Sequence, residues 1–220
     1  MPVTADDIAI AVRLSVETLA DAPDDWEQPA GALTWTCWET TEHIADSLFY
    51  YAAQIGRTPP PEPGPAPFTW IAQREGGPGG SVFADRAAGP TGLLQVVDAC
   101  GALLTSVVRT TAPTALAHHV FGLGDPRGFA AMGIVEVLVH THDVTVGLGL
   151  PWHPPTALCA RVLARLFPDV TGNGDAWATL LWATGRADLP DRPHRDEWRW
   201  HSAPLEPYHL PDPAPHPRFE

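Results

Sequence analysis

One segment of this 220-residue chain constrains its fold more than any other, because it is apolar on nearly every side. It covers residues 128–149 and reads GFAAMGIVEVLVHTHDVTVGLG. Asp125 is a typical N-cap residue, Pro126 suits a first helical turn, and Gly149 ends the pattern. A helix without a polar face has to be surrounded by other elements. The segment therefore predicts a buried helix at the centre of a larger helical protein.

Helical periodicity elsewhere in the chain supplies the partners for this helix. One helix should follow Thr4 and run to about Ala20, with Asp6 and Asp7 in its first turn. The further helices that we expect cover about 37–56 after the capping box Thr36–Glu39, about 91–111, about 155–167 and about 174–185.

The remaining segments are rich in proline and glycine. Residues 57–90 should form a long loop or a small hairpin in which FTWIAQ and SVFAD are the β-like pieces. From residue 186 onward, proline is frequent. We predict an all-α protein: a four-helix bundle with extra short helices over residues 1–185, and a Pro-rich C-terminal extension, 186–220, that packs on the bundle.

Composition excludes several classes of partner. The formal net charge is −13, which disfavours nucleic acids and anionic membrane surfaces. No segment has the roughly 18 uninterrupted apolar residues of a membrane span, and the start MPVTADD is not a signal sequence. We therefore expect a soluble, cytoplasmic protein; a homo-oligomer is left open. The cysteines Cys37, Cys100 and Cys159 form no CxxC pair, so we expect small core residues.

The central helix also carries the strongest chemical signal. Glu136 and His140 are one helical turn apart on a common face, among apolar neighbours. A buried carboxylate needs a partner. The pair either binds a metal ion or forms a buried hydrogen bond that serves packing only. Asp143 falls on the same face, where it either orients the imidazole or bonds a loop amide; His142 points away.

A metal ion would need a third ligand from another element. The candidates are His43 and the pair His118–His119, which we expect in a loop. The apolar stripe of the 37–56 helix lies opposite His43, so its polar stripe either faces solvent or lines a cleft. Trp26, Trp35 and Trp70 are expected to be packing anchors, one of which is free to line a pocket.

Two of these segments resemble the mycothiol-dependent maleylpyruvate isomerase-like family, which belongs to the DinB-like superfamily of metal-binding four-helix bundles. LTWTCWETTEHIADSLFYYA resembles its first motif, and GIVEVLVHTHDVTVGLG resembles its second motif. The resemblance covers roughly residues 5–185 and implies that His43, Glu136 and His140 hold the metal. His142 replaces the usual tryptophan of the family, which puts the pocket lining in doubt and leaves the ligand set intact.

The resemblance implies a zinc site, because two histidines and a carboxylate are a common catalytic zinc set with one open position. Other divalent metals tolerate the same ligands. Asp143 and Asp46 would support the ligands. The implied function is activation of a small thiol such as mycothiol for attack on a small electrophile. Maleylpyruvate isomerisation itself is not expected, because only about 35 residues follow the bundle where that enzyme has a substantial C-terminal domain. The alternatives are a non-catalytic metal- or ligand-binding protein and a metal-free structural bundle.

Overall fold

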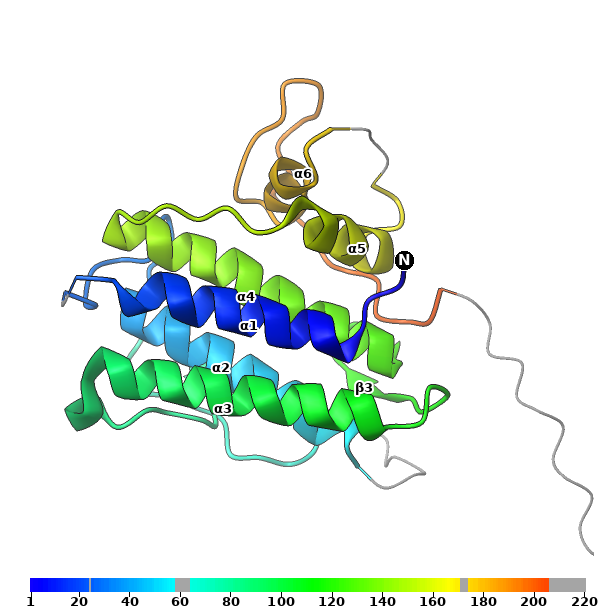
Figure 1. The fold of residues 1–220 in the computed structure, drawn as a ribbon, viewed down its shortest axis with the longest axis horizontal. Coiled ribbons are helices and arrows are strands. Elements are labelled where there is room, and N and C mark those ends of the chain that lie inside the picture. The colour runs from blue at the N-terminus through cyan, green and yellow to red at the C-terminus, as the bar shows by residue number, and fades with distance from the viewer. Residues whose placement is uncertain (24, 58–63, 171–173, 206–220) are drawn as a thin grey trace, which may run out of the picture.

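A computed structural model describes residues 1–23, 25–57, 64–170 and 174–205, and within these ranges the protein is mostly helical (Figure 1). The helices are α1 (Ala5–Ala20), α2 (Cys37–Ile55), the 3-10 helix η1 (Arg86–Ala88), α3 (Gly89–Thr110), α4 (Pro126–Leu148), α5 (Thr156–Leu166) and α6 (Ala176–Ala183). The strands are β1 (Ile71–Ala72), β2 (Gly79–Gly80), β3 (Ala117–His119) and β4 (Gly122–Gly124).

The long helices begin and end where their sequence signals predict. Thr4 and Thr36 each form a complete capping box, with Asp7 and Glu39 respectively. The Asp125 side chain caps α4 by accepting a hydrogen bond from the Gly128 N–H, at 2.7 Å. Gly149 ends α4 in the left-handed conformation, at φ 70°. The positions of all six α-helices in the described residues thus confirm the sequence prediction to within about two residues at each end.

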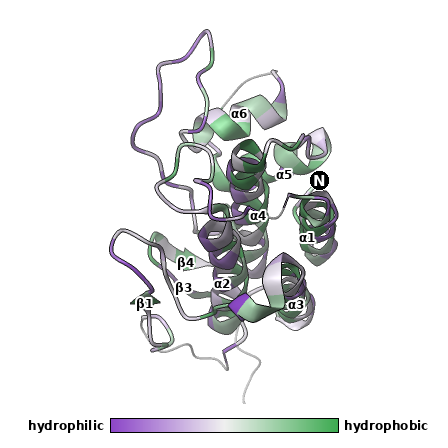
Figure 2. Ribbon diagram, turned by 90° about the vertical axis from the view of Figure 1, so that its left-hand side faces the viewer, coloured by the Kyte–Doolittle hydropathy of each residue, from purple (hydrophilic) through white to green (hydrophobic). Residues whose placement is uncertain are grey.

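The helix α4 lies in the middle of the protein, as its apolar sequence predicts. It packs against α1, α2, α3 and α5, and Figure 2 shows it surrounded by these helices. Phe129, Met132 and Leu138 are completely buried. Polar side chains also meet inside this core: the hydroxyls of Ser15 and Thr141 lie 2.6 Å apart between α1 and α4.

Two helices are long and apolar enough to cross a membrane by length and composition, namely residues Arg86–Thr110 and Pro126–Leu148. The apolar window of the second helix is 83% buried inside the protein, as is usual for the core helix of a soluble protein. The three cysteines are free and buried, which confirms their prediction as core residues.

The segment between α2 and η1 forms a strap, residues 64–84, along the polar stripe of α2. The β1–β2 hairpin lies within it, on the side of α2 away from α1 and α3 (Figure 2). FTWIAQ contributes β1, but SVFAD is not a strand, and that prediction is wrong. Gly79 and Gly80 pair with β1 instead, since a Cβ at Gly79 would lie 1.6 Å from the Trp70 indole nitrogen. Only a glycine lets that ring lie so close to the backbone.

A second hairpin, β3–β4, occupies the segment in which we expected a loop. His118 pairs with Leu123, and His119 pairs with Gly122. Beyond α6, the chain returns to this hairpin: Trp200 is buried, and its ring centroid lies 5.6 Å from that of His119. Residues 206–220 of the expected C-terminal extension lie outside the described residues.

Candidate metal centre

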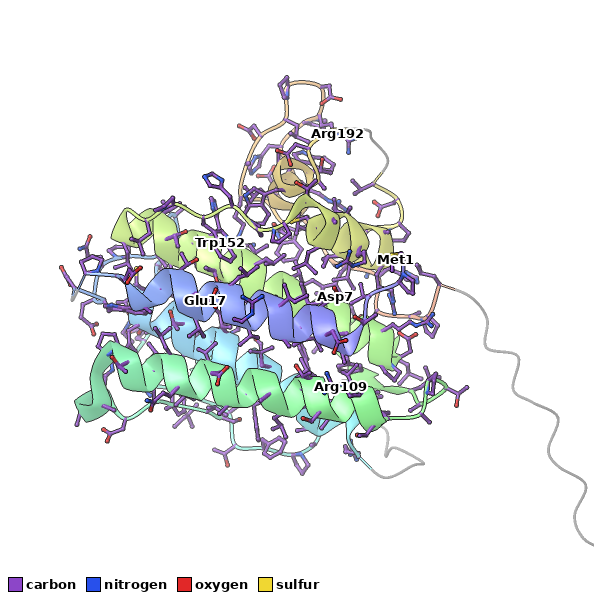
Figure 3. All side chains as sticks on the ribbon, in the orientation of Figure 1. Met1, Asp7, Glu17, Arg109, Trp152 and Arg192 are labelled. Carbon is purple, nitrogen blue, oxygen red and sulfur yellow. The ribbon has the colours of Figure 1, made fainter. Side chains whose placement is uncertain are left out.

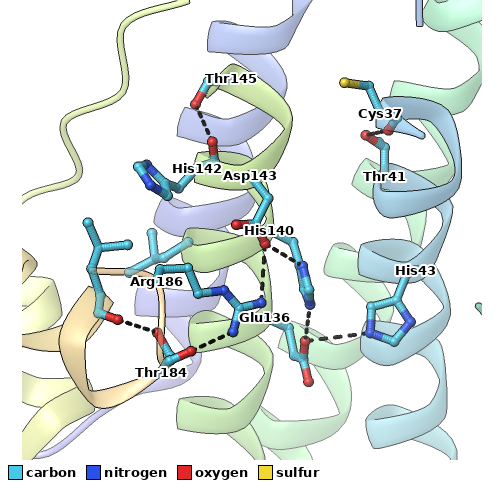
Figure 4. A network of polar contacts seen from close by, with 12 residues as sticks. Cys37, Thr41, His43, Glu136, His140, His142, Asp143, Thr145, Thr184 and Arg186 are labelled. Carbon is cyan, nitrogen blue, oxygen red and sulfur yellow. Dashed lines mark hydrogen bonds and ion pairs between the residues drawn. The ribbon is translucent and has the colours of Figure 1, made fainter. Parts of the chain in front are cut away.

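Three side chains that are far apart in the sequence meet between α2 and α4 (Figure 4). Glu136 Oε2 lies 3.1 Å from His140 Nε2 and 3.8 Å from His43 Nε2. One ligand atom from each of the three residues lies within 4.8 Å of the other two. Two ring nitrogens and one carboxylate oxygen at this separation can hold a metal ion.

His43 lies on the polar stripe of α2, and the strap covers this face of the helix. The strap lies along the polar stripe of α2 and is held there by side chains of that stripe. Glu39 forms a bidentate ion pair with Arg74, at 2.6 and 2.7 Å, and Gln54 accepts a hydrogen bond from the Ala66 N–H at 3.0 Å. His43 therefore faces the interior of a cleft, and its side chain is only 18% exposed. The Trp35 ring packs against it, with centroids 5.0 Å apart.

Glu136 is ionised in this environment. Burial would raise the pKa of its carboxyl group, but the hydrogen bond with His140 and the charges of the two histidines lower that pKa to about 2. Tyr51 donates a hydrogen bond to Oε1 at 3.0 Å. The other oxygen, Oε2, is thus left to the two imidazoles. The sequence analysis did not identify Tyr51, and its spacing from His43, two turns along α2, is the signal that was available.

The two histidines differ in their surroundings. Burial and, to a smaller extent, the neighbouring His140 lower the pKa of His43 to about 4, although the charge of Glu136 acts to raise it. Burial also acts to lower the pKa of His140, but its hydrogen bonds with Asp143 and Glu136 outweigh burial and raise it. Nδ1 of His43 has no hydrogen-bond partner among the described residues.

Asp143 lies next to His140, as its position on the helix face predicts. Its Oδ2 is 3.0 Å from His140 Nδ1. In the neutral ring, a proton on Nδ1 leaves the lone pair of Nε2 available to a metal ion in the cluster. Oδ2 also accepts a hydrogen bond from Arg186 at 3.2 Å, so within the described parts of the chain Asp143 bonds two side chains and no loop amide. Arg186, which follows α6, is a site residue that the sequence analysis missed, because no local pattern connects it to α4.

Asp46 does not contact the three residues of the cluster among the described contacts. Its Oδ1 accepts the backbone N–H groups of Ser81 and Val82, at 2.6 and 2.9 Å, and so fixes the strap to α2. The expectation that it supports a metal ligand directly is not what the structure shows. It lies one turn from His43, but the unpaired amides of the strap compete for its carboxylate.

A pocket of about 250 Å³ opens beside the cluster. Aromatic rings make up much of its wall. The lining residues are His43, Asp46, Ser47, Tyr50, Tyr51, Trp70, His119, Val120, Phe121, Glu136 and Trp200. Of the expected packing anchors, Trp26 is buried, whereas Trp70 belongs to this wall and is 55% exposed. The pocket thus joins an aromatic surface to the possible metal position.

The other candidate histidines take different roles. His119 lies in the pocket wall but outside the cluster, and His118 is the neighbouring residue in β3. His142 packs against Trp177 of α6, with ring centroids 5.7 Å apart, and so points away from the cluster as predicted.

Comparison of the chain with protein-family models, with curated proteins and with solved structures finds no match.

Proposed function

We propose that this protein is a metal-dependent, thiol-transferase-like enzyme, which activates a small thiol such as mycothiol for attack on a small electrophile. The observation that carries the proposal is the convergence of His43, Glu136 and His140 at the edge of an aromatic pocket. The proposal includes a DinB-like four-helix bundle as the fold, membership of the mycothiol-dependent maleylpyruvate isomerase-like family, and a cytoplasmic location, where small thiols are kept reduced.

The donor set fits zinc. Two neutral imidazoles and an ionised carboxylate suit a tetrahedral ion whose fourth position stays open to a substrate. Two of the ligands also have a hydrogen-bond partner that orients them: Asp143 bonds Nδ1 of His140, and Tyr51 donates to Oε1 of Glu136. Zinc in this position would supply Lewis acidity, which lowers the pKa of a thiol or water in the open position.

In this proposal, the residues around the cluster orient the ligands, limit the access of water and bind the second substrate. The ion pair between Asp143 and Arg186 keeps the imidazole of His140 in one orientation. Trp35 covers both histidine rings, at 5.0 and 6.2 Å, and limits the access of water to the cluster. The aromatic wall binds the apolar body of the second substrate beside the thiol, which reduces the entropy cost of their reaction.

The first test is the metal content of the purified protein. We expect about one zinc ion per chain in the wild type after dialysis against zinc, and loss of that zinc in His43→Ala, Glu136→Gln and His140→Ala. His142→Ala is the matched control, since this histidine lies on the same helix but packs against Trp177. A wild type that binds no zinc would leave a metal-free structural bundle and refute the proposal.

The second test is thiol consumption. Zinc-loaded wild type is mixed with 1-chloro-2,4-dinitrobenzene and either mycothiol, cysteine or glutathione, and formation of the thioether is followed by absorbance. We expect conjugation above the uncatalysed rate with at least one thiol, and none with Glu136→Gln. Zinc binding without thiol consumption would indicate a non-catalytic metal-binding protein instead.

A further inference from the structure

The wall of the pocket contains a buried histidine that the metal cluster does not use. His119 is 4% exposed and lies among the rings of Tyr51, Phe121, Phe129 and Trp200, with centroids 5.3–6.5 Å from its own. Burial of an imidazole in such an apolar environment has a higher desolvation cost than burial of a phenylalanine ring. The position of His119 therefore indicates a specific role.

The hydrogen bonds of His119 fix its tautomer. The backbone N–H of Phe121 donates to Nδ1 at 3.1 Å, so this nitrogen carries a lone pair and no proton. The Ser202 hydroxyl also lies 3.1 Å from Nδ1. Burial lowers the pKa of the ring to about 4, so the imidazole is neutral at pH 7 and its single proton is on Nε2.

The Nε2–H group is the free end of this arrangement. Nε2 has no hydrogen-bond partner among the described residues. It is also not among the fully buried polar atoms that lack a partner, so part of its surface is accessible to solvent. Because His119 lines the pocket, a molecule bound there can accept this hydrogen bond. A hydrogen-bond donor on a rigid hairpin, in a wall of aromatic rings, is typical of a site that orients a ligand.

The charges around the pocket disfavour an anion. Asp46 and Glu136 are both lining residues, no arginine is among the described lining residues, and the chain contains no lysine. His119 is the lining base outside the metal cluster, and burial lowers its pKa to about 4. We therefore expect the metal-free protein to bind an uncharged ligand more tightly than an anion.

We infer that the pocket binds an uncharged aromatic molecule that carries one hydrogen-bond-accepting oxygen, such as a ketone, and that His119 Nε2–H donates to that oxygen. The inference rests on the proposed function in one respect, namely that this molecule is the electrophile that the thiol attacks. His119 is then a recognition residue that holds the carbonyl group, while the rings of Tyr50, Trp70 and Phe121 contact the aromatic body.

Three probes of similar size test this assignment: 2-acetylnaphthalene, its hydrocarbon isostere 2-isopropylnaphthalene, and the anion 2-naphthoate. Binding is measured by equilibrium dialysis, once in EDTA and once with zinc, so that a contribution of the metal is seen separately. In EDTA, we expect the wild type to bind the ketone about three- to tenfold more tightly than the hydrocarbon, which is the usual effect of one hydrogen bond, and the anion most weakly.

Two substitutions separate the two nitrogens of His119. In His119→Asn, the amide oxygen can replace Nδ1 as the acceptor for Phe121, but no group reaches the position of Nε2. In His119→Gln, the amide N–H₂ can reach that position. We expect the preference for the ketone to disappear in the first variant and to persist in the second. His118→Asn is the control, because successive residues of a strand point to opposite faces.

The assignment is overturned if the wild type binds none of the probes, if it binds ketone and hydrocarbon equally, if 2-naphthoate binds best in EDTA, or if His119→Asn keeps the preference. Circular dichroism shows whether each variant folds, and the comparison of probes on the wild type remains decisive if His119→Asn does not. These measurements in EDTA need neither metal nor thiol, so their failure is distinct from failure of the proposed zinc chemistry.

Discussion

Replacement of Arg165 by methionine should destabilise the protein strongly, because this residue joins three parts of the chain inside the protein. Its guanidinium forms an ion pair with Asp125 at 2.7 Å, and the two side chains are only 9% and 7% exposed. It also donates hydrogen bonds to the backbone carbonyls of His201 and Ser202, each at 3.0 Å. Methionine keeps most of the aliphatic stem and removes all of these donors.

The magnitude follows from the burial of the pair. Removal of one partner of a buried ion pair costs about 3–5 kcal/mol, and in Arg165→Met the buried carboxylate of Asp125 loses the guanidinium that it pairs with. For a protein of this size, about 1 kcal/mol corresponds to about 2–4 °C in Tm. We therefore expect Arg165→Met to lower Tm by about 6–20 °C.

The matched control is Arg109→Met. Arg109 lies near the C-terminal end of α3 (Figure 3). It also pairs with an aspartate, Asp6, but the two side chains are 56% and 79% exposed. An exposed pair contributes about 0–1 kcal/mol, so Tm should fall by less than about 4 °C. The double variant Arg165→Met/Asp125→Asn should be more stable than Arg165→Met alone, because the asparagine still caps α4 and removes the buried charge.

Thermal unfolding followed by circular dichroism measures all of these variants. The reasoning is refuted if Arg165→Met and Arg109→Met have the same Tm, or if the double variant is no more stable than the single one. Since the carbonyls that Arg165 holds flank the segment of Trp200, we also expect Arg165→Met to weaken binding of 2-acetylnaphthalene in the pocket.

Three further predictions concern the metal, acid stability and packing. Zinc at about 100 times its Kd should stabilise the wild type by about 2.7 kcal/mol in thermal unfolding; we expect no such shift in His140→Ala and the full shift in His142→Ala, and equal shifts in both would contradict the ligand assignment. Burial acts to raise the pKa of Asp7, but hydrogen bonds from Arg161 and Thr4 lower it below 3.8, so the stability that this carboxylate contributes is complete above pH 3.8 and is lost as the pH falls below that value. Urea unfolding from pH 7 to pH 3 should therefore show that the free energy of unfolding of the wild type exceeds that of Asp7→Asn by about 1.5–3 kcal/mol, and that this difference decreases only below pH 3.8. A decrease of the difference between pH 6 and pH 5 would refute this assignment. Gly147→Ala would place a Cβ 2.4 Å from the backbone oxygen of Pro29, which cannot move as a side-chain end can, and should lower the free energy of unfolding by about 1–3 kcal/mol; an unchanged urea midpoint would show that the segment before α2 yields freely.

Much of the helical framework is local, and the sequence alone was enough to predict it. Caps, periodicity and glycine stops depend on residues within one or two turns, so the bounds of α1, α2 and α4 could be predicted closely. The contact between Glu136 and His140 is of the same kind, because residues four apart on a helix meet whatever surrounds that helix. Asp143 completes that group by the same periodicity.

The composition of the site beyond that helix was decided by tertiary packing. The pattern of α2 left the direction of His43 open, and only the strap, which covers the polar stripe, turns that stripe into the wall of a cleft. The same strap engages the carboxylate of Asp46 with its backbone amides, although sequence spacing associates this residue with His43.

Arg186 and His119 reach the site from segments that are distant from α4 in the sequence. Their positions depend on how α6 and the β3–β4 hairpin pack, and no local pattern encodes that packing. Helical periodicity is a property of neighbours along the chain, so the sequence by itself determined one half of the candidate metal centre. The other half and the pocket beside it exist only because distant, mutually dependent contacts fold the chain back onto α4.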